Sequence, residues 1–205
     1  FPVDSLALVD FLRAFLEAPA RLADFEAFRV PHGGQRDFFV CTHGQVDICC
    51  AKFGVPLYRQ AREAGPGVRA WRITHFGGHR YAPTAWEFPS DYRWGFLDEA
   101  GAQQVLTRKG PASARRLNVR VQLLDRAGLD RYGWGWLDFR RHGDVLEENE
   151  DGRRSRVRLT FEGPRGERGV YEGVVGIGRE VEEPGCGPHF GEHPYLAPEF
   201  VLESF

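Results

Sequence analysis

The sequence contains no methionine, only four cysteines and almost no net charge. Lys and Arg number 27 against 29 Asp and Glu, which leaves a formal charge of −2. Because the charges are balanced and scattered, nothing electrostatic favours nucleic acid or an anionic membrane surface as a partner. The longest apolar run, from Leu6 to Leu16, is interrupted by Asp10 and Arg13 and is shorter than the roughly 20 residues of a membrane span. We therefore expect no nucleic-acid partner, no membrane partner and no transmembrane helix.

The composition that is present is typical of a folded protein. The chain has 205 residues, of which 42% are hydrophobic and 16 are Phe, enough for a buried core in one domain or in one domain with a smaller subdomain. It begins at Phe1 without a methionine, so we expect that further residues preceded it. Two of the four cysteines are adjacent, which does not resemble the disulfide framework of a secreted domain, and we expect a reducing, cytoplasmic location.

The pattern predicts three regions. Residues 1–34 form an amphipathic helix, with apolar side chains at three- and four-residue spacing until Pro19. Residues 35–110 alternate strands and helices in the order of a thioredoxin-like α/β domain, and Ala82-Pro83 resembles the cis-proline of that fold. The predicted elements are strand Arg36–Val40, helix Cys50–Glu63, strand Val68–Ile73, strand Pro83–Phe88, strand Tyr92–Phe96 and helix Asp98–Lys109.

Residues 111–205 are predicted to be a C-terminal extension, helical at first and then a β-meander. The helical part runs from Ala112 to Arg140 with a turn at Gly133–Trp136. Asp-Gly and Pro-Arg-Gly turns then separate three antiparallel strands. These strands are expected within residues 145–148, 156–161 and 170–181, and residues 185–193 are expected to form a loop.

Two short segments hold ligand-type residues. Cys41, Cys49 and Cys50 surround the start of the first predicted helix of the α/β domain, and His75 and His79 flank Phe76-Gly77-Gly78. Thiolate and imidazole ligands suit iron-sulfur clusters, zinc or copper, and the glycines let the loop turn so that two imidazoles converge. Cys41 and Cys50 are separated by eight residues, wider than the about two to four of a zinc knuckle, so zinc is the second choice. Residues and spacing leave Cys49 and Cys50 open as alternatives.

These segments resemble the sucrase/ferredoxin-like family, whose better-understood relatives are thioredoxin-like ferredoxins. The resemblance covers residues 35–110 and is carried by Cys-Thr-His-Gly from 41, Asp-x-Cys-Cys-Ala from 47, Gly-x-Pro-Leu-Tyr from 54 and His-x-Gly-Gly-His-Arg-Tyr-Ala-Pro-Thr from 75. It implies a [2Fe-2S] cluster in which Cys41 and Cys50 ligate one iron and His75 and His79 the other. Family spacing favours Cys50 over Cys49.

The implied ligand set indicates a one-electron carrier rather than a catalyst. Two thiolates leave an oxidised [2Fe-2S] core formally neutral, which favours electron uptake relative to four thiolates. Rieske centres, with the same ligand types, have potentials of roughly −150 to +300 mV, against about −400 mV for four-cysteine ferredoxins. We expect an intermediate potential and a redox partner protein of unknown identity. No carboxylate pair suited to glycoside hydrolysis can be picked out.

Two other functions are weighed against this one. A zinc-stabilised binding module would use the metal only to hold the strand-to-helix loop. A thiol redox protein on a thioredoxin fold would be expected to carry Cys-x-x-Cys, which is absent from the sequence. Residues beside the ligands are expected either to tune the centre or to be ordinary cap and loop residues: His43, Asp47, Arg80 and Tyr81. A weaker cluster of Cys186, His189 and His193 is expected to be structural.

Overall fold

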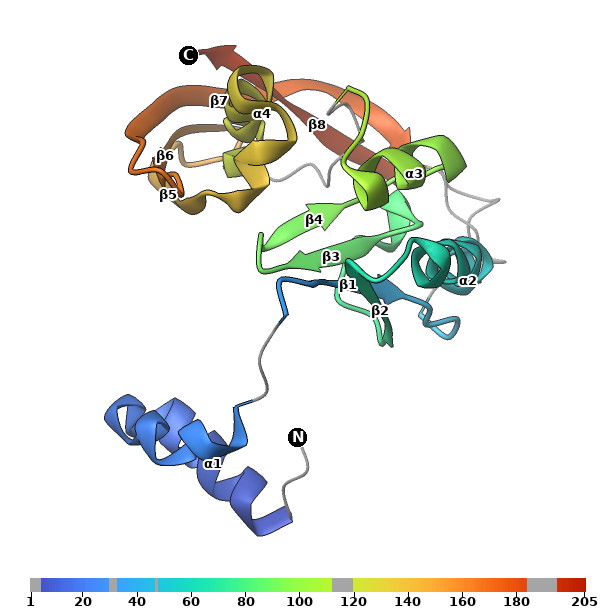
Figure 1. Cartoon of the computed structure of the whole chain (residues 1–205). Helices are drawn as coiled ribbons and strands as arrows, with labels where there is room; N and C mark the ends of the chain where they lie inside the picture. The colour runs from blue at the N-terminus through green and yellow to red at the C-terminus, as the bar shows by residue number, and fades with distance from the viewer. Residues whose placement is uncertain (1–4, 30–32, 47, 112–119, 184–194) are drawn as a thin grey trace. The chain divides into compact units, whose positions relative to one another are not determined.

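The computed structural model describes residues 5–29, 33–46, 48–111, 120–183 and 195–205. The chain divides into two compact units, Phe1–Gln35 and Arg36–Phe205. The second unit is mixed α/β and contains two separate four-stranded sheets (Figure 1). Within the described residues, no helix is long and apolar enough to cross a membrane.

The first unit contains the predicted amphipathic helix, α1 (Ser5–Glu17), followed by the 3-10 helix η1 (Pro19–Phe28). Pro19 stands at the start of η1, where proline is tolerated because its missing N–H would be unpaired anyway. The ring of Phe11 packs edge-on against Phe25 at 5.4 Å, which joins the two helices. The prediction of a helix broken at Pro19 is confirmed.

The first sheet of the second unit has the strand order β2-β1-β3-β4. Strands β1 and β2 are parallel, and the other pairs are antiparallel. Its strands are β1 (Arg36–Cys41), β2 (Val68–Ile73), β3 (Ala85–Phe88) and β4 (Tyr92–Trp94). All four predicted strands are present. The last one ends at Trp94 rather than at Phe96, because Phe96 adopts a left-handed backbone with φ of 52°.

Strand β1 shows how the sequence selects a buried face. Phe38 and Val40 are fully buried, whereas Asp37 and Phe39 alternate with them and are only partly buried. This two-residue period is the one expected of a strand whose two faces meet different surroundings. Because β1 lies between β2 and β3, its C-terminal residue, Cys41, is held by neighbours on both sides.

Two helices accompany this sheet, α2 (Ile48–Glu63) and α3 (Glu99–Thr107). Helix α2 contacts β1, β2 and α3 and buries Leu57 and Ala61. Helix α3 begins where the Asp98 carboxylate accepts a hydrogen bond from the Gly101 N–H at 2.7 Å, which satisfies one of the unpaired donors of its first turn. The predicted helices are confirmed, although α2 starts two residues before Cys50.

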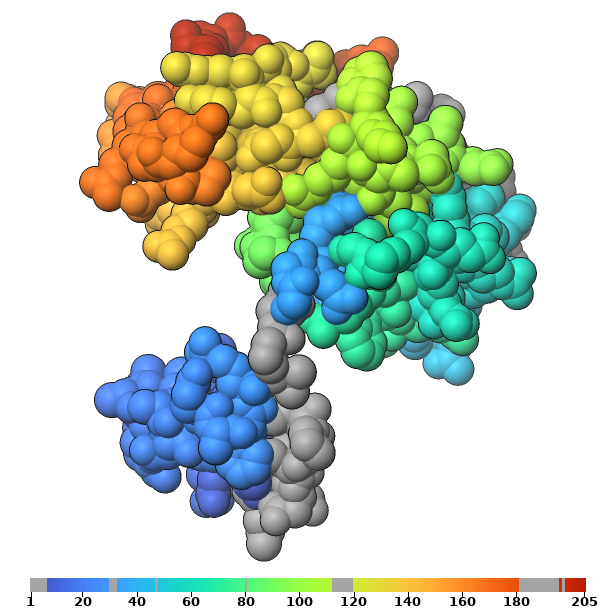
Figure 2. All heavy atoms as spheres, viewed as in Figure 1, coloured from blue at the N-terminus to red at the C-terminus, as the bar shows by residue number. Residues whose placement is uncertain are grey.

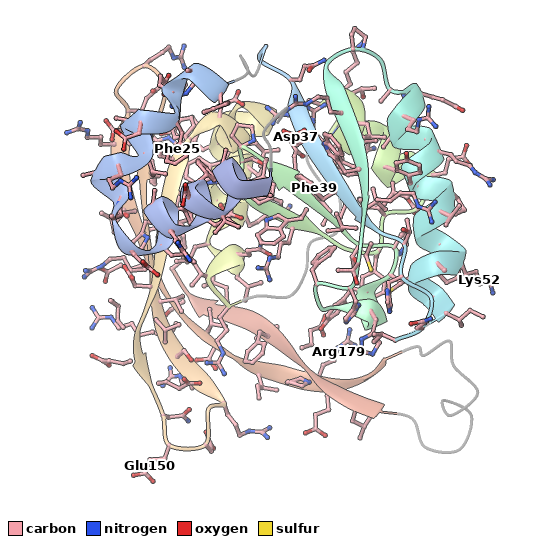
Figure 3. All side chains as sticks on the ribbon, turned by 90° about the horizontal axis from the view of Figure 1, so that it is seen from below. Phe25, Asp37, Phe39, Lys52, Glu150 and Arg179 are labelled. Carbon is pink, nitrogen blue, oxygen red and sulfur yellow. The ribbon has the colours of Figure 1, made fainter. Side chains whose placement is uncertain are left out.

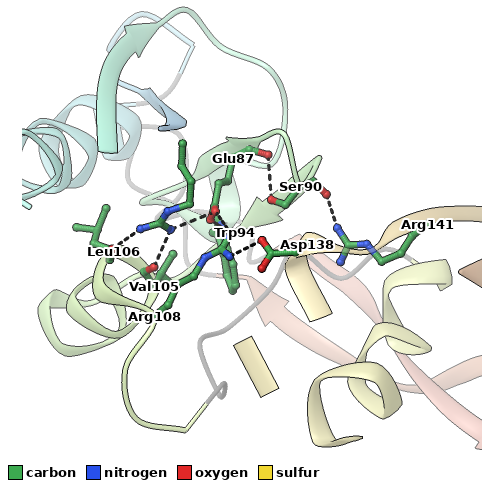
Figure 4. Close-up of polar contacts among 9 residues, drawn as sticks. Glu87, Ser90, Trp94, Val105, Leu106, Arg108, Asp138 and Arg141 are labelled. Atoms are coloured by element: carbon green, nitrogen blue, oxygen red, sulfur yellow. Dashed lines mark hydrogen bonds and ion pairs between the residues drawn. The ribbon is translucent and has the colours of Figure 1, made fainter. Parts of the chain in front are cut away.

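A buried carboxylate ties this sheet to the rest of the unit (Figure 4). Glu87 of β3 is fully buried and accepts from Arg36 at 3.2 Å, from Arg108 at 2.9 Å and from the Trp94 indole at 3.1 Å. Arg108 reaches on to Asp138 at 2.8 Å. Since a buried charge is tolerated only when it is paired and hydrogen-bonded, this cluster fixes the positions of its partners.

The next part of the chain is helical, as predicted. It contains η3 (Arg120–Leu123), α4 (Asp125–Tyr132) and η4 (Gly133–Asp138), with the expected turn beginning at Gly133. Trp136 is fully buried, and its indole N–H donates to Asp125 at 2.7 Å. The Trp134 indole donates to the Gly110 carbonyl at 2.9 Å. In the space-filling view the segment of α3, in light green, abuts that of α4 and η4, in yellow (Figure 2).

The C-terminal sheet is antiparallel in the order β5-β6-β7-β8. Its strands are β5 (Arg140–Glu148), β6 (Arg154–Glu162), β7 (Arg168–Glu183) and β8 (Tyr195–Ser204). Glu150 lies at the tip of the hairpin that joins β5 and β6 (Figure 3). The three predicted strands are present, but the prediction of a three-stranded meander is wrong because β8 adds a fourth. Pro198 made a strand unexpected here, because proline has no N–H to donate within a sheet. Strand β8 is nevertheless an edge strand, where proline is tolerated.

Candidate metal centre

The candidate centre is built where β1 ends. Cys41 is the last residue of β1, is fully buried and donates its backbone N–H to the Thr84 carbonyl at 3.2 Å. Thr84 directly precedes β3, after an Ala82–Pro83 peptide bond that is cis, as the sequence resemblance predicted. The Cys41 sulfur is therefore held by a strand that has partners on both sides.

Helix α2 brings the second sulfur to the first. Cys50 lies in the first turn of α2 and is 1% exposed. One turn later, a Cβ at Gly54 would collide with the carbonyl oxygen of Cys41 and lie 3.1 Å from its carbonyl carbon. Only glycine allows α2 to pass so close to the end of β1. Gly54 is thus a residue of the centre that ligand-type reasoning missed, although it is part of the Gly-x-Pro-Leu-Tyr segment.

The loop after β2 supplies the imidazole. Nδ1 of His75 lies 3.9 Å from the sulfur of Cys41 and 3.9 Å from that of Cys50. The ligand atoms of Cys41, Cys50 and His75 all lie within 4.8 Å of one another, as a group that could hold a metal ion. Gly77 and Gly78 have φ of 98° and 71°, in the left-handed region that favours glycine, and they turn the loop back after His75.

His79 follows this turn. It begins the 3-10 helix η2 (His79–Tyr81), and its ring centroid lies 5.5 Å from that of His75 at an interplanar angle of 49°. His79 is half-buried and lies beside the group of three without being one of its members. The structure therefore brings Cys41, Cys50 and His75 together and places His79 next to them.

The sulfur of Cys49 is bonded differently from the sulfurs of Cys41 and Cys50. Cys41 and Cys50 form no disulfide, whereas Cys49, in the same helical turn, is held in a disulfide. Of the two adjacent cysteines, Cys50 is therefore the one whose thiol is available beside Cys41. Nothing in the sequence distinguished the two apart from family spacing.

Cys41 is poised to act as a thiolate. The pKa of its thiol is lowered from an ordinary 9.0 to about 5, chiefly because the Cys50 side chain hydrogen-bonds to it. Burial opposes this shift, while the backbone N–H of His43 and the side chain of His75 add to it. At neutral pH a metal would therefore meet a ligand that has already lost its proton, which favours binding.

The neighbours of these residues have varied roles. Nδ1 of His43 lies 3.3 Å from the Thr74 hydroxyl. The ring of Tyr81 packs edge-on against Phe96 at 5.3 Å, as an ordinary loop contact. The other residues considered from the sequence lie outside the part of the chain that the structure describes. They are Asp47, the side chain of Arg80, and the weaker cluster of Cys186, His189 and His193.

Comparison with known proteins found one family that matches the chain. The family model described as Sucrase/ferredoxin-like matches residues 3–119, more than half of the chain. The match includes all four predicted ligands and extends the sequence resemblance at residues 35–110 towards the N-terminus. No curated protein and no solved structure matches the chain. The chain therefore belongs to the Sucrase/ferredoxin-like family.

Proposed function

We propose that Cys41, Cys50, His75 and His79 hold a [2Fe-2S] cluster and that the protein carries single electrons. The observation that carries this proposal is the convergence of two buried thiols outside any disulfide with His75, beside His79. When bound, such a cluster would accept and release one electron. Membership of a family described as ferredoxin-like supports the same function.

The donor set fits this cofactor. Iron-sulfur clusters are held by cysteine thiolates, and histidine replaces two of the four in Rieske-type centres. Cys41 is ready to ligate as a thiolate because its pKa is lowered to about 5. Two thiolates rather than four add less negative charge, so we expect a potential above the roughly −400 mV of four-cysteine ferredoxins.

A groove beside the centre leaves the four proposed ligands outside its lining. A groove of about 720 Å³ runs along α2 to the start of α3, and it is lined by Phe53, Pro56, Pro83 and Phe96 among others. None of the four proposed ligands lines it. A carrier needs only proximity to its partner, whereas an enzyme places its reactive groups in a pocket that fits a substrate.

We further propose that residues 35–110 form a thioredoxin-like domain. The element order β1, α2, β2, β3, β4, α3 and the strand order β2-β1-β3-β4 support this proposal. In this arrangement the C-terminal end of β1 lies beside the loop that precedes β3. Cys41 and Thr84 lie at this point.

One observation favours a second candidate, a single structural zinc ion. Zn–S distances of about 2.3 Å and Zn–N distances of about 2.0 Å place neighbouring ligand atoms of a tetrahedral ion roughly 3.5 Å apart. The two sulfur-to-nitrogen distances at His75 are 3.9 Å, close to that spacing. In this case the metal would hold β1, α2 and the His75 loop together without redox chemistry.

Metal analysis separates the two candidates. The protein would be purified without oxygen, its ultraviolet-visible spectrum recorded, and iron, acid-labile sulfide and zinc assayed on one sample. We expect red-brown protein with iron and sulfide in equal amounts. Colourless protein with stoichiometric zinc would establish the structural site instead, and protein without metal even after reconstitution would refute both.

A further inference from the structure

The buried hydroxyl of Thr84, beside the candidate centre, lacks a hydrogen-bond partner among the described residues. Thr84 is 1% exposed, and its Oγ1 has no hydrogen-bond partner among the residues that the structure describes. Buried hydroxyls are nearly always hydrogen-bonded, because an unpaired one loses its bonds to water without replacement. An acceptor that becomes available only when metal is bound would account for this one.

The β1/β3 ladder places Thr84 opposite Cys41. Val40 pairs with Ala85 in the antiparallel register, so the next pair along the ladder is Cys41 with Thr84. Their backbones are joined by the 3.2 Å hydrogen bond from the Cys41 N–H to the Thr84 carbonyl. Directly opposed residues of an antiparallel pair point to the same face, with Cβ atoms about 4.5–5.5 Å apart. The Thr84 hydroxyl therefore lies on the same side of the sheet as the Cys41 sulfur.

Metal binding changes which hydrogen bonds the Cys41 sulfur can accept. Without metal, its main side-chain hydrogen bond is with Cys50. A metal ion needs both sulfurs as thiolates, and Cys50 then has no proton to donate. The metal-bound Cys41 sulfur still accepts hydrogen bonds, but Cys50 can no longer donate one to it.

We propose that the Thr84 hydroxyl donates a hydrogen bond to the Cys41 sulfur in the metal-loaded protein. Thr84 is then a positioning residue that fixes the sulfur and reduces its electron donation to the metal. The inference rests on the metal site proposed above, with Cys41 as a ligand, but not on which metal occupies it. For an iron-sulfur centre the bond stabilises the more negative, reduced state and raises the potential.

Two variants isolate the hydroxyl. Thr84→Val keeps the shape of the side chain and removes the donor, whereas Thr84→Ser keeps the donor. In cobalt-loaded protein, we expect the thiolate-to-cobalt charge-transfer band of T84V to move to longer wavelength and that of T84S to stay at the wild-type position. In iron-loaded protein, we expect T84V to bind its electron about tenfold more weakly, a fall of about 59 mV for one electron, with T84S near wild type.

The cobalt and iron measurements distinguish failure of this inference from failure of the proposed function. Wild-type protein that binds cobalt but holds no iron or sulfide would refute the cluster, and the cobalt band would still decide the role of Thr84. An unchanged band in T84V at equal cobalt content would overturn the inference. If T84V does not fold, Thr84→Ala provides the same comparison. The metal-free variant should be no less stable than wild type, because the hydroxyl is unpaired there, and a clear loss of stability would also count against the inference.

Discussion

Gly54 of α2 packs directly against the carbonyl group of Cys41, with no room for a Cβ between them. This contact sets the distance between helix and strand, and with it the separation of the Cys41 and Cys50 sulfurs. A site made from two elements depends on how closely their backbones approach.

Gly54→Ala should therefore lose metal and stability together. The obstructing atoms belong to backbone, so α2 has to move, and overpacking of this kind typically costs about 1–3 kcal/mol. Metal content and denaturant unfolding would be measured for both forms. Gly67→Ala is the matched control, because a Cβ there meets no atom within 4 Å. Full metal content in G54A would show that the contact does not set the site.

The adjacent cysteines should behave oppositely. Cys50→Ser removes a thiol of the candidate centre, and we expect it to abolish metal binding. Cys49→Ser removes a disulfide-bonded cysteine and should lower stability while leaving metal content near that of wild type. Metal would be assayed well below the unfolding temperature of each variant. Loss of metal in C49S with retention in C50S would reverse the ligand assignment.

His79 distinguishes a two-iron centre from a single ion. A cluster with two cysteine and two histidine ligands loses one ligand in His79→Ala, so we expect iron and sulfide to fall to background. A zinc ion held by Cys41, Cys50 and His75 keeps its three protein ligands and should remain bound. Iron, sulfide and zinc contents of the variant, with His142→Ala as a surface control, decide between the two. Undiminished iron and sulfide in H79A would exclude His79 as a ligand.

The thiol of Cys41 should make the stability of the metal-free protein depend on pH. Its folded-state pKa is lowered to about 5 from an ordinary 9.0, so the unfolded chain binds the proton more tightly. The stabilising contribution is then fully present above about pH 9 and is lost as the pH falls towards 5. Unfolding would be followed across this range under reducing conditions. Cys41→Ser should flatten the slope between pH 9 and 5, and an equal slope in both proteins would contradict the shift.

Glu87→Gln should destabilise the α/β unit without acting on the centre directly. The substitution leaves Arg36 and Arg108 without their shared carboxylate, and breaking a buried ion pair typically costs about 3–5 kcal/mol. Denaturant unfolding measures the loss. Glu162→Gln, which breaks an exposed pair with Arg168, should change stability little. If E87Q and E162Q unfolded at the same denaturant concentration, the buried cluster would contribute nothing specific.

Local sequence patterns determined most elements of this protein. The alternation in β1, the apolar stripe of α2 and the glycine and proline breakers predicted where strands and helices lie, because these preferences act over a few residues. Residue types likewise pointed to Cys41, His75, His79 and one of Cys49 and Cys50 as candidate ligands, and the family resemblance favoured Cys50. The exception is β8, where Pro198 argues locally against a strand and an edge position in the sheet permits one.

Tertiary structure alone decided which side chains meet. The contact of Gly54 with Cys41, the pairing of Thr84 with Cys41 and the burial of Glu87 between two arginines all join residues far apart in the chain. Such contacts depend on register and on helix-to-strand distance, which no local preference encodes. The sequence by itself determined the types of candidate ligand and the order of the elements, whereas packing between β1, α2 and the His75 loop determined that three of those candidates converge.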